Sequence, residues 1–374
     1  MSLRPDTKVV SYDGIFAFEI GDCLGSGKQG TVYEVKANNI GLNDIVIKII
    51  GGKQISSQIL NHIEQLLTPE IKKMLCQIPS LKCVLVTPFI SYNDKCCLLM
   101  PRAKGLVLET DDAWDQIRQL SMNQKYELAR QIVHGIEVIH QAGRIHADIA
   151  GPNIIIDKDQ LRAYIVDIDG GGVINSIPAI VAGHPMWMAP ELEKTQNPDD
   201  VTLESDRWSL AALIHHVIVG CHPFAFCSDV KYYCNYEQNW PPNPHDFDPH
   251  DFDPHDPPNP QDFNGIKEWL VWQHRVLKKI GDLAELFKRC FGPGQSNPKI
   301  RPTATEWKRH LSQLAGNKTV HTELCPKCGY ANKNELVYCE NCASILHQAL
   351  IRCSRCESYI AVNASFCPRC GAKV

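Results

Sequence analysis

The segment HADIAGPN at residues 146–153, followed by IVDID at residues 165–169, decides the fold of this chain. Asp148 and Asn153 stand five positions apart in the first segment, and one isoleucine separates Asp167 from Asp169 in the second. The meaning of the two segments depends on the motifs that precede and follow them in the chain.

A glycine-rich turn lies upstream, where residues 24–32 read LGSGKQGTV. The pattern GxGxxG also occurs in dinucleotide-binding turns and in plain glycine hairpins. A dinucleotide-binding turn is followed at once by a helix, whereas residues 31–35 read TVYEV, which is typical of a strand. The turn is therefore predicted to join two antiparallel strands, with Gly25, Gly27 and Gly30 letting the backbone lie over nucleotide phosphates.

A lysine ends the next apolar strand, IVIK at residues 45–48. Lys48 could extend its ammonium group into solvent. Alternatively, it contacts the α- and β-phosphates of a nucleotide and is held by a glutamate of a helix. Glu70 is the preferred partner because of its distance ahead of the strands predicted at Cys83 and Cys96, and Glu64 is the alternative.

Four further motifs lie downstream in order: APE at residues 189–191, DRWS at 206–209, GCHPF at 220–224 and RPT at 301–303. Together with the glycine-rich turn and the two central segments, they resemble the ordered motifs of the eukaryotic-like (Hanks-type) bacterial protein kinases. HADIAGPN stands for HRDxxxxN and DID for DFG. The resemblance covers about residues 12–314 and implies an ATP-dependent serine/threonine kinase that acts on protein hydroxyls in bacterial signalling or stress response.

The resemblance implies a role for each matching position. Asp148 is similar to the catalytic base that orients the substrate hydroxyl and accepts its proton. Asn153 and Asp167 would hold Mg²⁺, and Lys48 would position the phosphates. The other residues expected to bind ATP are Gly25, Gly27, Gly30, Val32, Glu70, Met100 as gatekeeper and residues 101–103, ending at Ala103, as the adenine-binding hinge.

The family also implies structural roles. Glu191 and Arg301 are expected to form a buried ion pair, and Asp206 to brace the catalytic loop. His146 is expected to be a packed core residue rather than a catalyst.

Three departures from the family pattern concern regulation and substrate class. Ala147 replaces the arginine that normally receives an activation-loop phosphate, and the 25 residues from Asp167 to Glu191 contain one hydroxyl side chain, Ser176. Ala150 replaces the lysine typical of serine/threonine kinases, which weakens the assignment of substrate class. Asp169 replaces the glycine of DFG but leaves the metal-binding carboxylate in place.

The expected fold is α+β: a two-lobed protein kinase fold followed by two small zinc-ribbon modules. Strands are predicted around the glycine-rich turn in residues 16–34, then at 45–50, 83–89 and 96–100, with a helix at 57–75 that kinks or restarts at Pro69. Helices follow at 126–141, 266–291 and 303–314. The predicted domains are the kinase domain 12–314 (N-lobe about 12–100, C-lobe about 104–314) and the ribbons 323–346 and 350–374.

Eight of the 17 cysteines form four CxxC pairs near the C-terminal end. Two pairs separated by ten residues can place four thiolates around one Zn²⁺, and the same spacing occurs twice. Four cysteine ligands leave no open coordination position, so both sites are predicted to be structural. Disulfides or loose thiols are the alternative. The predicted zinc ligands are Cys325, Cys328, Cys339, Cys342, Cys353, Cys356, Cys367 and Cys370.

The other nine cysteines are predicted to be packing residues. Residues 240–263 contain repeated Pro, Asp and His and are expected to form a solvated loop at 241–263 rather than a metal site.

Composition limits the setting of the protein. A net charge of −4 gives no reason to expect binding to nucleic acid or to anionic membranes. Without an apolar N-terminal segment or a run of about 18 apolar residues, a cytoplasmic protein is expected.

The resemblance also suggests partners: a protein substrate, a PP2C-type phosphatase and a von Willebrand A-domain protein. Two other functions stay open. One is a pseudokinase scaffold that assembles partners through the ribbons, and the other is a regulator that binds nucleic acid through them.

Overall fold

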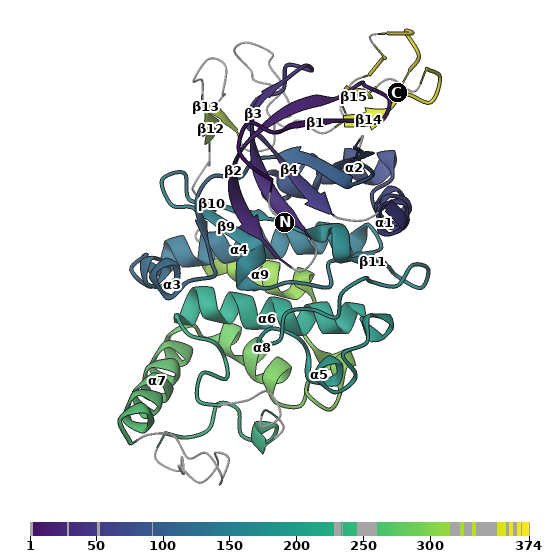
Figure 1. Ribbon diagram of the computed structural model, residues 1–374. Coiled ribbons are helices and arrows are strands. Elements are labelled where there is room, and N and C mark those ends of the chain that lie inside the picture. Colours follow the sequence, from purple (N-terminus) through teal and green to yellow (C-terminus); the bar gives the residue numbers. More distant parts are fainter. Residues whose placement is uncertain are drawn as a thin grey trace. The chain divides into compact units, whose positions relative to one another are not determined.

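Six antiparallel strands form the main sheet of the computed structural model, in the order β1-β2-β3-β4-β6-β5 (Figure 1). An isolated antiparallel bridge joins Ser11, just after β1, to Ser91, just after β5. Because β1 and β5 are the two edges of the sheet, this bridge curls the sheet toward closure. The strands are β1 (Lys8–Val10), β2 (Ala17–Ser26), β3 (Thr31–Asn38), β4 (Ile45–Ile50), β5 (Thr87–Ile90) and β6 (Cys96–Pro101).

The structure describes residues 3–27, 30–50, 53–91, 93–227, 233, 235–244, 260–314, 322–324, 331–333, 350–356, 359–361, 365–367 and 369–373. The chain folds into two structural units. The first comprises Met1–Lys104, Tyr164–Asp169 and Val320–Val374, and the second Gly105–Ala163 and Gly170–Thr319. Among the described residues, no helix is both long enough and apolar enough to cross a membrane.

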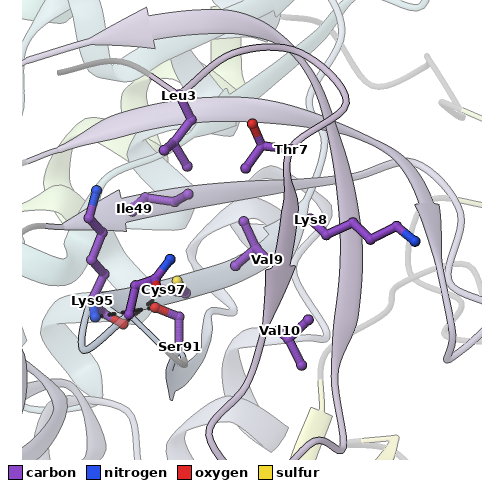
Figure 2. Close-up of a pocket in the computed structure, with 10 residues that line it drawn as sticks. Leu3, Thr7, Lys8, Val9, Val10, Ile49, Ser91, Lys95 and Cys97 are labelled. Atoms are coloured by element: carbon purple, nitrogen blue, oxygen red, sulfur yellow. Dashed lines mark hydrogen bonds between the residues drawn. The ribbon is translucent and has the colours of Figure 1, made fainter.

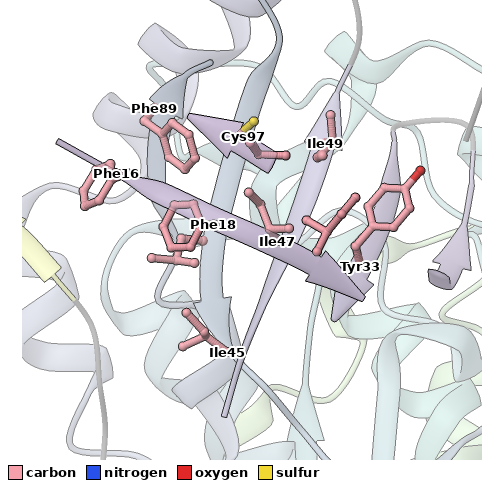
Figure 3. Packing of buried hydrophobic residues seen from close by; sticks show 11 residues of the cluster. Phe16, Phe18, Tyr33, Ile45, Ile47, Ile49, Phe89 and Cys97 are labelled. Atoms are coloured by element: carbon pink, nitrogen blue, oxygen red, sulfur yellow. The ribbon is translucent and has the colours of Figure 1, made fainter. Parts of the chain in front are cut away.

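Aromatic and β-branched side chains fill the inside of the curled sheet. The ring centroids of Phe16, Phe18 and Phe89 lie 5.2 to 5.8 Å apart, and Ile47, which lies beside Phe18, is fully buried (Figure 3). This core fixes the register in which Lys48 of β4 lies opposite Val32 of β3 and Leu98 of β6.

A cavity of about 310 Å³ opens in the same sheet, lined by Leu3, Val9, Ile49 and Cys97 among others (Figure 2). None of the residues predicted to bind ATP lines this cavity. It is therefore separate from the site that the sequence predicts.

Two helices, α1 (Lys53–Leu66) and α2 (Pro69–Leu75), take the place of the single helix expected at 57–75. Thr68 caps α2 by accepting a hydrogen bond from the backbone N–H of Ile71, so the chain restarts at Pro69 rather than kinking. The strand predicted at 83–89 is wrong in its first half, because Pro79 opens a 3₁₀ helix, Pro79–Val84, and β5 begins only at Thr87.

The second unit is mainly helical, and α4 packs against α6 and α9. The predicted apolar face of α4 is confirmed, since Leu128, Ile132, Ile136 and Ile139 are all fully buried. Its helices are α3 (Asp111–Arg118), α4 (Met122–Gln141), α5 (Pro190–Thr195), α6 (Leu203–Val219), α7 (Pro260–Lys279), α8 (Asp282–Phe291) and α9 (Ala304–Leu314).

The helix expected at 266–291 is two helices, because Gly281 adopts a φ of +54° between α7 and α8. The loop predicted at 241–263 ends earlier than expected, since Pro260 begins α7. Residues 245–259 of that loop lie outside the described part of the chain.

Short strands complete the two units. β7 (Leu106–Val107) pairs with β9 (Ile154–Asp157), and β8 (Arg144–Ile145) pairs with β11 (Gly172–Val173). β10 (Arg162–Ile165) leads into Asp167. Near the C-terminal end, β12 (Thr322–Leu324) pairs with β13 (Ala331–Lys333), and β14 (Leu350–Arg352) with β15 (Tyr359–Ala361).

The predicted ion pair between Arg301 and Glu191 is present. Two guanidinium nitrogens of Arg301 donate to the two carboxylate oxygens of Glu191, each at 2.7 Å. The Arg301 side chain is fully buried, donates also to the carbonyls of Gly294 and Glu204, and lies over the ring of Trp208. This arginine therefore ties the segment before α9 to α5 and α6.

We expect the substitution Arg301→Ala to lower the free energy of unfolding by about 3 kcal/mol, because it removes the fully buried partner of the ion pair and leaves two carbonyls without their donor. Chemical denaturation followed by tryptophan fluorescence measures this change. Lys288→Ala is the matched control, since Lys288 forms an exposed pair with Glu285 one turn away, and we expect an effect below about 0.5 kcal/mol. Equal effects of the two substitutions would contradict the structural role of Arg301.

Candidate functional site

The glycine-rich turn joins β2 to β3 as a hairpin, as the sequence predicts, and Gly25 lies opposite Val32. The backbone N–H of Gly27 donates to the carbonyl of Gly30 at 2.9 Å. A Cβ at Gly30 would lie 2.7 Å from the carbonyl oxygen of Ile49, so only glycine fits there. Around Gly25 and Gly27, a Cβ would meet nothing within 4 Å, so packing within the chain does not require these glycines. Open space above the turn is what a bound phosphate chain needs.

Lys48 is buried, and its ammonium group contacts two carboxylates. Its Nζ donates to Oδ1 of Asp167, and to Oδ2 and Oδ1 of Asp169 at 3.0 and 3.2 Å. The side chains of Lys48 and Asp169 are each 4% exposed, whereas that of Asp167 is 29% exposed. The alternative in which Lys48 extends into solvent is therefore wrong.

The charges of this cluster shift one another's protonation. Burial lowers the pKa of Lys48, but the negative charges of Asp169 and Asp167 outweigh it and raise that pKa above its usual range. Burial, with the charge of Asp167, raises the pKa of Asp169 to about 7, although Lys48 acts in the opposite direction. Lys48 thus stays a cation that can bind phosphate.

The structure does not bring Glu70 or Glu64 to Lys48. Glu70 is exposed in the first turn of α2, where its own backbone N–H and Thr68 lower the pKa of its carboxyl. Glu64 is exposed on α1, and its charge acts on Lys72. The prediction that Glu70 holds Lys48 is wrong because Pro69 starts a separate helix and places Glu70 at its exposed N-terminal end.

The predicted hinge continues β6. Met100 is buried and lies opposite Val46, and Pro101 lies opposite Ile45. Proline has no backbone N–H, so Pro101 can offer adenine only a carbonyl. Ala103, the last residue of the predicted hinge, is half-buried.

The catalytic-loop segment in the second unit holds Asp148 and Asn153 together. The amide nitrogen of Asn153 donates to the backbone carbonyl of Asp148 at 2.8 Å and to its Oδ2 at 2.9 Å. The backbone N–H of Asp148 donates to Nδ1 of His146 at 3.3 Å. His146 is fully buried, which confirms its predicted place in the core.

Asp206 braces this loop, as predicted. Its two carboxylate oxygens accept the backbone N–H groups of His146 at 2.8 Å and Ala147 at 2.9 Å. Ala147 has a φ of +69°, a left-handed conformation that costs about 1 to 2 kcal/mol for a residue with a Cβ. The two hydrogen bonds from Asp206 hold the strained turn that carries Asp148.

Four cysteines of the second ribbon surround one point. The Sγ atoms of Cys353 and Cys370 lie 3.5 Å apart, those of Cys356 and Cys367 lie 3.6 Å apart, and all four fall within 4.8 Å of one another. Disulfides are excluded between these pairs, since an S–S bond is about 2.05 Å long. Zn–S bonds of about 2.3 Å in a tetrahedron place sulfur atoms about 3.8 Å apart, so the four thiolates fit one zinc ion.

The remaining cysteines divide by burial. Cys96, Cys97, Cys221 and Cys290 are buried, and burial raises the pKa of each thiol to about 12, so they are unreactive packing residues. Cys23 is exposed on β2, so its predicted packing role is wrong. Cys234 and the four cysteines of the first ribbon (Cys325, Cys328, Cys339 and Cys342) lie outside the described residues.

Comparisons with known proteins agree with this geometry. The protein kinase domain model matches residues 18–311, and the double zinc ribbon model matches residues 325–371. The human serine/threonine-protein kinase ULK1 is 25% identical over 236 residues, which are 60% of this chain and 21% of ULK1. Cell division control protein 7 of Schizosaccharomyces pombe is 26% identical over 215 residues, which are 55% of this chain and 18% of that protein. The chain thus spans about a fifth of the length of these curated relatives.

A solved structure shows the same fold. The kinase domain of Mycobacterium tuberculosis PknI, crystallised as a double mutant, superposes with a TM-score of 0.52 at 16% sequence identity. The match covers 84% of this chain and 100% of that domain.

Proposed function

Because this chain belongs to the protein kinase family, we propose that it transfers the γ-phosphoryl group of ATP to a serine or threonine hydroxyl of a protein substrate. The observation that carries the proposal is the contact of the buried Lys48 with Asp167, since a lysine in this strand and a metal-binding aspartate are what the family needs to hold the phosphates. The catalytic-loop residues Asp148 and Asn153 supply the remaining chemical groups.

In the proposed reaction, the substrate hydroxyl oxygen forms a bond to the γ-phosphorus, and the bond from that phosphorus to the β–γ bridging oxygen breaks, releasing ADP. Asp148 orients the hydroxyl and takes its proton. Lys48 binds the α- and β-phosphates, and the backbone at Gly25 and Gly27 covers them. Arg102, which is ion-paired with Glu34, holds the start of the hinge against β3.

The family resemblance assigns magnesium to Asp167 and Asn153, and each offers the kind of oxygen donor that this ion prefers. Asp167 offers a partly exposed carboxylate, and both hydrogen bonds of Asn153 use its amide nitrogen, so the amide oxygen can serve as a ligand. When bound there, Mg²⁺ would neutralise charge on the phosphates.

Labelled phosphate transfer tests the proposal. The full chain is incubated with γ-labelled ATP, Mg²⁺ and a mixture of casein and myelin basic protein, and the labelled products are hydrolysed in acid. We expect phosphoserine and phosphothreonine, and no transfer by Asp167→Asn. Phosphotyrosine alone would overturn the proposed serine/threonine substrate class. If the wild type and Asp167→Asn both transfer no more phosphate than the background, a pseudokinase scaffold is favoured.

We also propose that the two zinc ribbons bind protein partners. The proposed domains are the kinase domain 12–314 and the ribbons 323–346 and 350–374, and the proposed location is the cytoplasm. A PP2C-type phosphatase and a von Willebrand A-domain protein are the partners that the family resemblance suggests. Identifying the proteins that co-purify with the full chain tests this, with a ribbon variant as control. If the full chain instead retains nucleic acid, and this retention falls as the salt concentration rises, a regulator that binds nucleic acid through the ribbons is favoured.

A further inference from the structure

We propose that Asp169 is the positioning residue that anchors Lys48, in the role that other kinases give to a helix glutamate, and that neither Glu64 of α1 nor Glu70 of α2 takes part in this anchor. The inference rests on the proposed function, because anchoring matters only if Lys48 binds phosphates. Asp169 stands where the family has a glycine, so this carboxylate is an addition to the usual set.

The contact between Lys48 and Asp169 is buried and uses both oxygens of the carboxylate. Both carboxylate oxygens of Asp169 accept hydrogen bonds from Nζ, at 3.0 and 3.2 Å, and both side chains are 4% exposed. Asp169 lies in the 3₁₀ turn Ile168–Gly170, next to the fully buried Ile168. Its charge also raises the pKa of Cys96, which places it close to the first residue of β6. The carboxylate of Asp169 is thus held by its hydrogen bonds to Lys48 of β4.

The cluster holds one more carboxylate than Lys48 needs. A buried lysine paired with two carboxylates leaves an excess negative charge, which is unfavourable unless another cation is present. Asp167 is the more exposed of the two and is the residue proposed to turn to Mg²⁺. Asp169 would then stay hydrogen-bonded to Lys48 while Asp167 binds the metal.

The glutamates of the two N-terminal helices do not compete for this role. Glu64 is the one acidic residue in the sequence of α1, and its charge acts on Lys72. Glu70 is exposed at the start of α2. In kinases whose lysine depends on a helix glutamate, moving that helix switches the enzyme. Here the anchor lies two residues from the aspartate proposed to bind Mg²⁺, so it does not depend on a glutamate of α1 or α2.

A double-mutant cycle on unfolding tests the anchor without using catalysis. Asp169→Asn keeps the side-chain volume and removes the charge. We expect Asp169→Asn to change the unfolding equilibrium constant about tenfold more in the wild-type chain than in a chain that already carries Lys48→Met. The effect should be smaller in the second chain because the partner of Asp169 is already missing there. Additive effects of the two substitutions would overturn the anchor. If the coupling is found but the wild type transfers no phosphate, the proposed function fails while the anchor stands.

Steady-state kinetics then distinguish an anchoring role of Asp169 from a role in binding metal or ATP. We expect Asp169→Asn and Asp169→Gly to lower kcat by about 10- to 100-fold, with less than a threefold change in the Kd of ATP by calorimetry. Glu64→Gln and Glu70→Gln should change kcat less than about twofold. A large loss of kcat in either glutamate variant would overturn the proposal. Recovery of the activity of Asp169→Asn at high Mg²⁺ would also overturn it, because it would show that Asp169 is a metal ligand.

Discussion

Replacing Asp148 by asparagine should reduce the phosphoryl transfer rate by about 10³-fold, because the amide cannot accept the proton of the substrate hydroxyl. The substitution preserves the size of the side chain. Its carbonyl oxygen can still accept from the amide nitrogen of Asn153, which donates to Asp148 Oδ2 at 2.9 Å in the native loop. The loss should therefore appear in kcat, with the Kd of ATP and the thermal stability close to those of the wild type.

Asp159→Asn is the matched control for this variant. Asp159 is exposed in the turn between β9 and β10, eleven positions further along the chain, and its substitution should leave kcat unchanged. Initial rates with labelled ATP, measured for all three proteins on one substrate, make the comparison. If the wild type and Asp148→Asn transfer phosphate equally poorly, the chain is a scaffold and not an enzyme.

The predictions that the structure confirms come either from local sequence spacing or from the family resemblance. The hydrogen bond between Asn153 and Asp148 was not predicted, but the two residues are five positions apart, so the short turn between them largely determines it. The glycine-rich turn is similar, because the strand residues on both sides of it determine the hairpin. The ion pair of Arg301 with Glu191 spans 110 positions, and only the family resemblance could assign it.

The predictions that failed depend on where helices begin and on distant contacts. The sequence leaves open whether the helix kinks or restarts at Pro69, and the observed restart, capped by Thr68, leaves the carboxylate of Glu70 exposed. Asp169 is recognisable in the sequence as a substitution for glycine, but its contact with Lys48 spans 121 positions. The sequence does carry a chemical signal: Asp169 adds a carboxylate two residues from the aspartate proposed to bind Mg²⁺, and α1 carries only one acidic residue.

Replacing Cys353 by serine should lower the zinc content from two ions per chain to one and unfold the second ribbon. A structural Zn²⁺ site contributes about 10 to 16 kcal/mol of apparent binding free energy at pH 7, and a module of about 25 residues has too little core to fold without it. Cys353 and Cys367 are the two ligands that are 3% and 2% exposed, so loss of either also opens the interior of the ribbon.

Zinc content by atomic emission and cleavage sites by limited proteolysis measure the two effects, and both should also follow removal of zinc by a chelator. Cys23→Ser is the matched control, because Cys23 is an exposed thiol of β2 outside the four-sulfur cluster, and it should retain two zinc ions. The kinase domain has its own buried cores, so we expect the cleavage in Cys353→Ser to be confined to residues beyond about 345. Unchanged zinc in Cys353→Ser would show that the four sulfur atoms, although within 4.8 Å of one another, do not bind the metal.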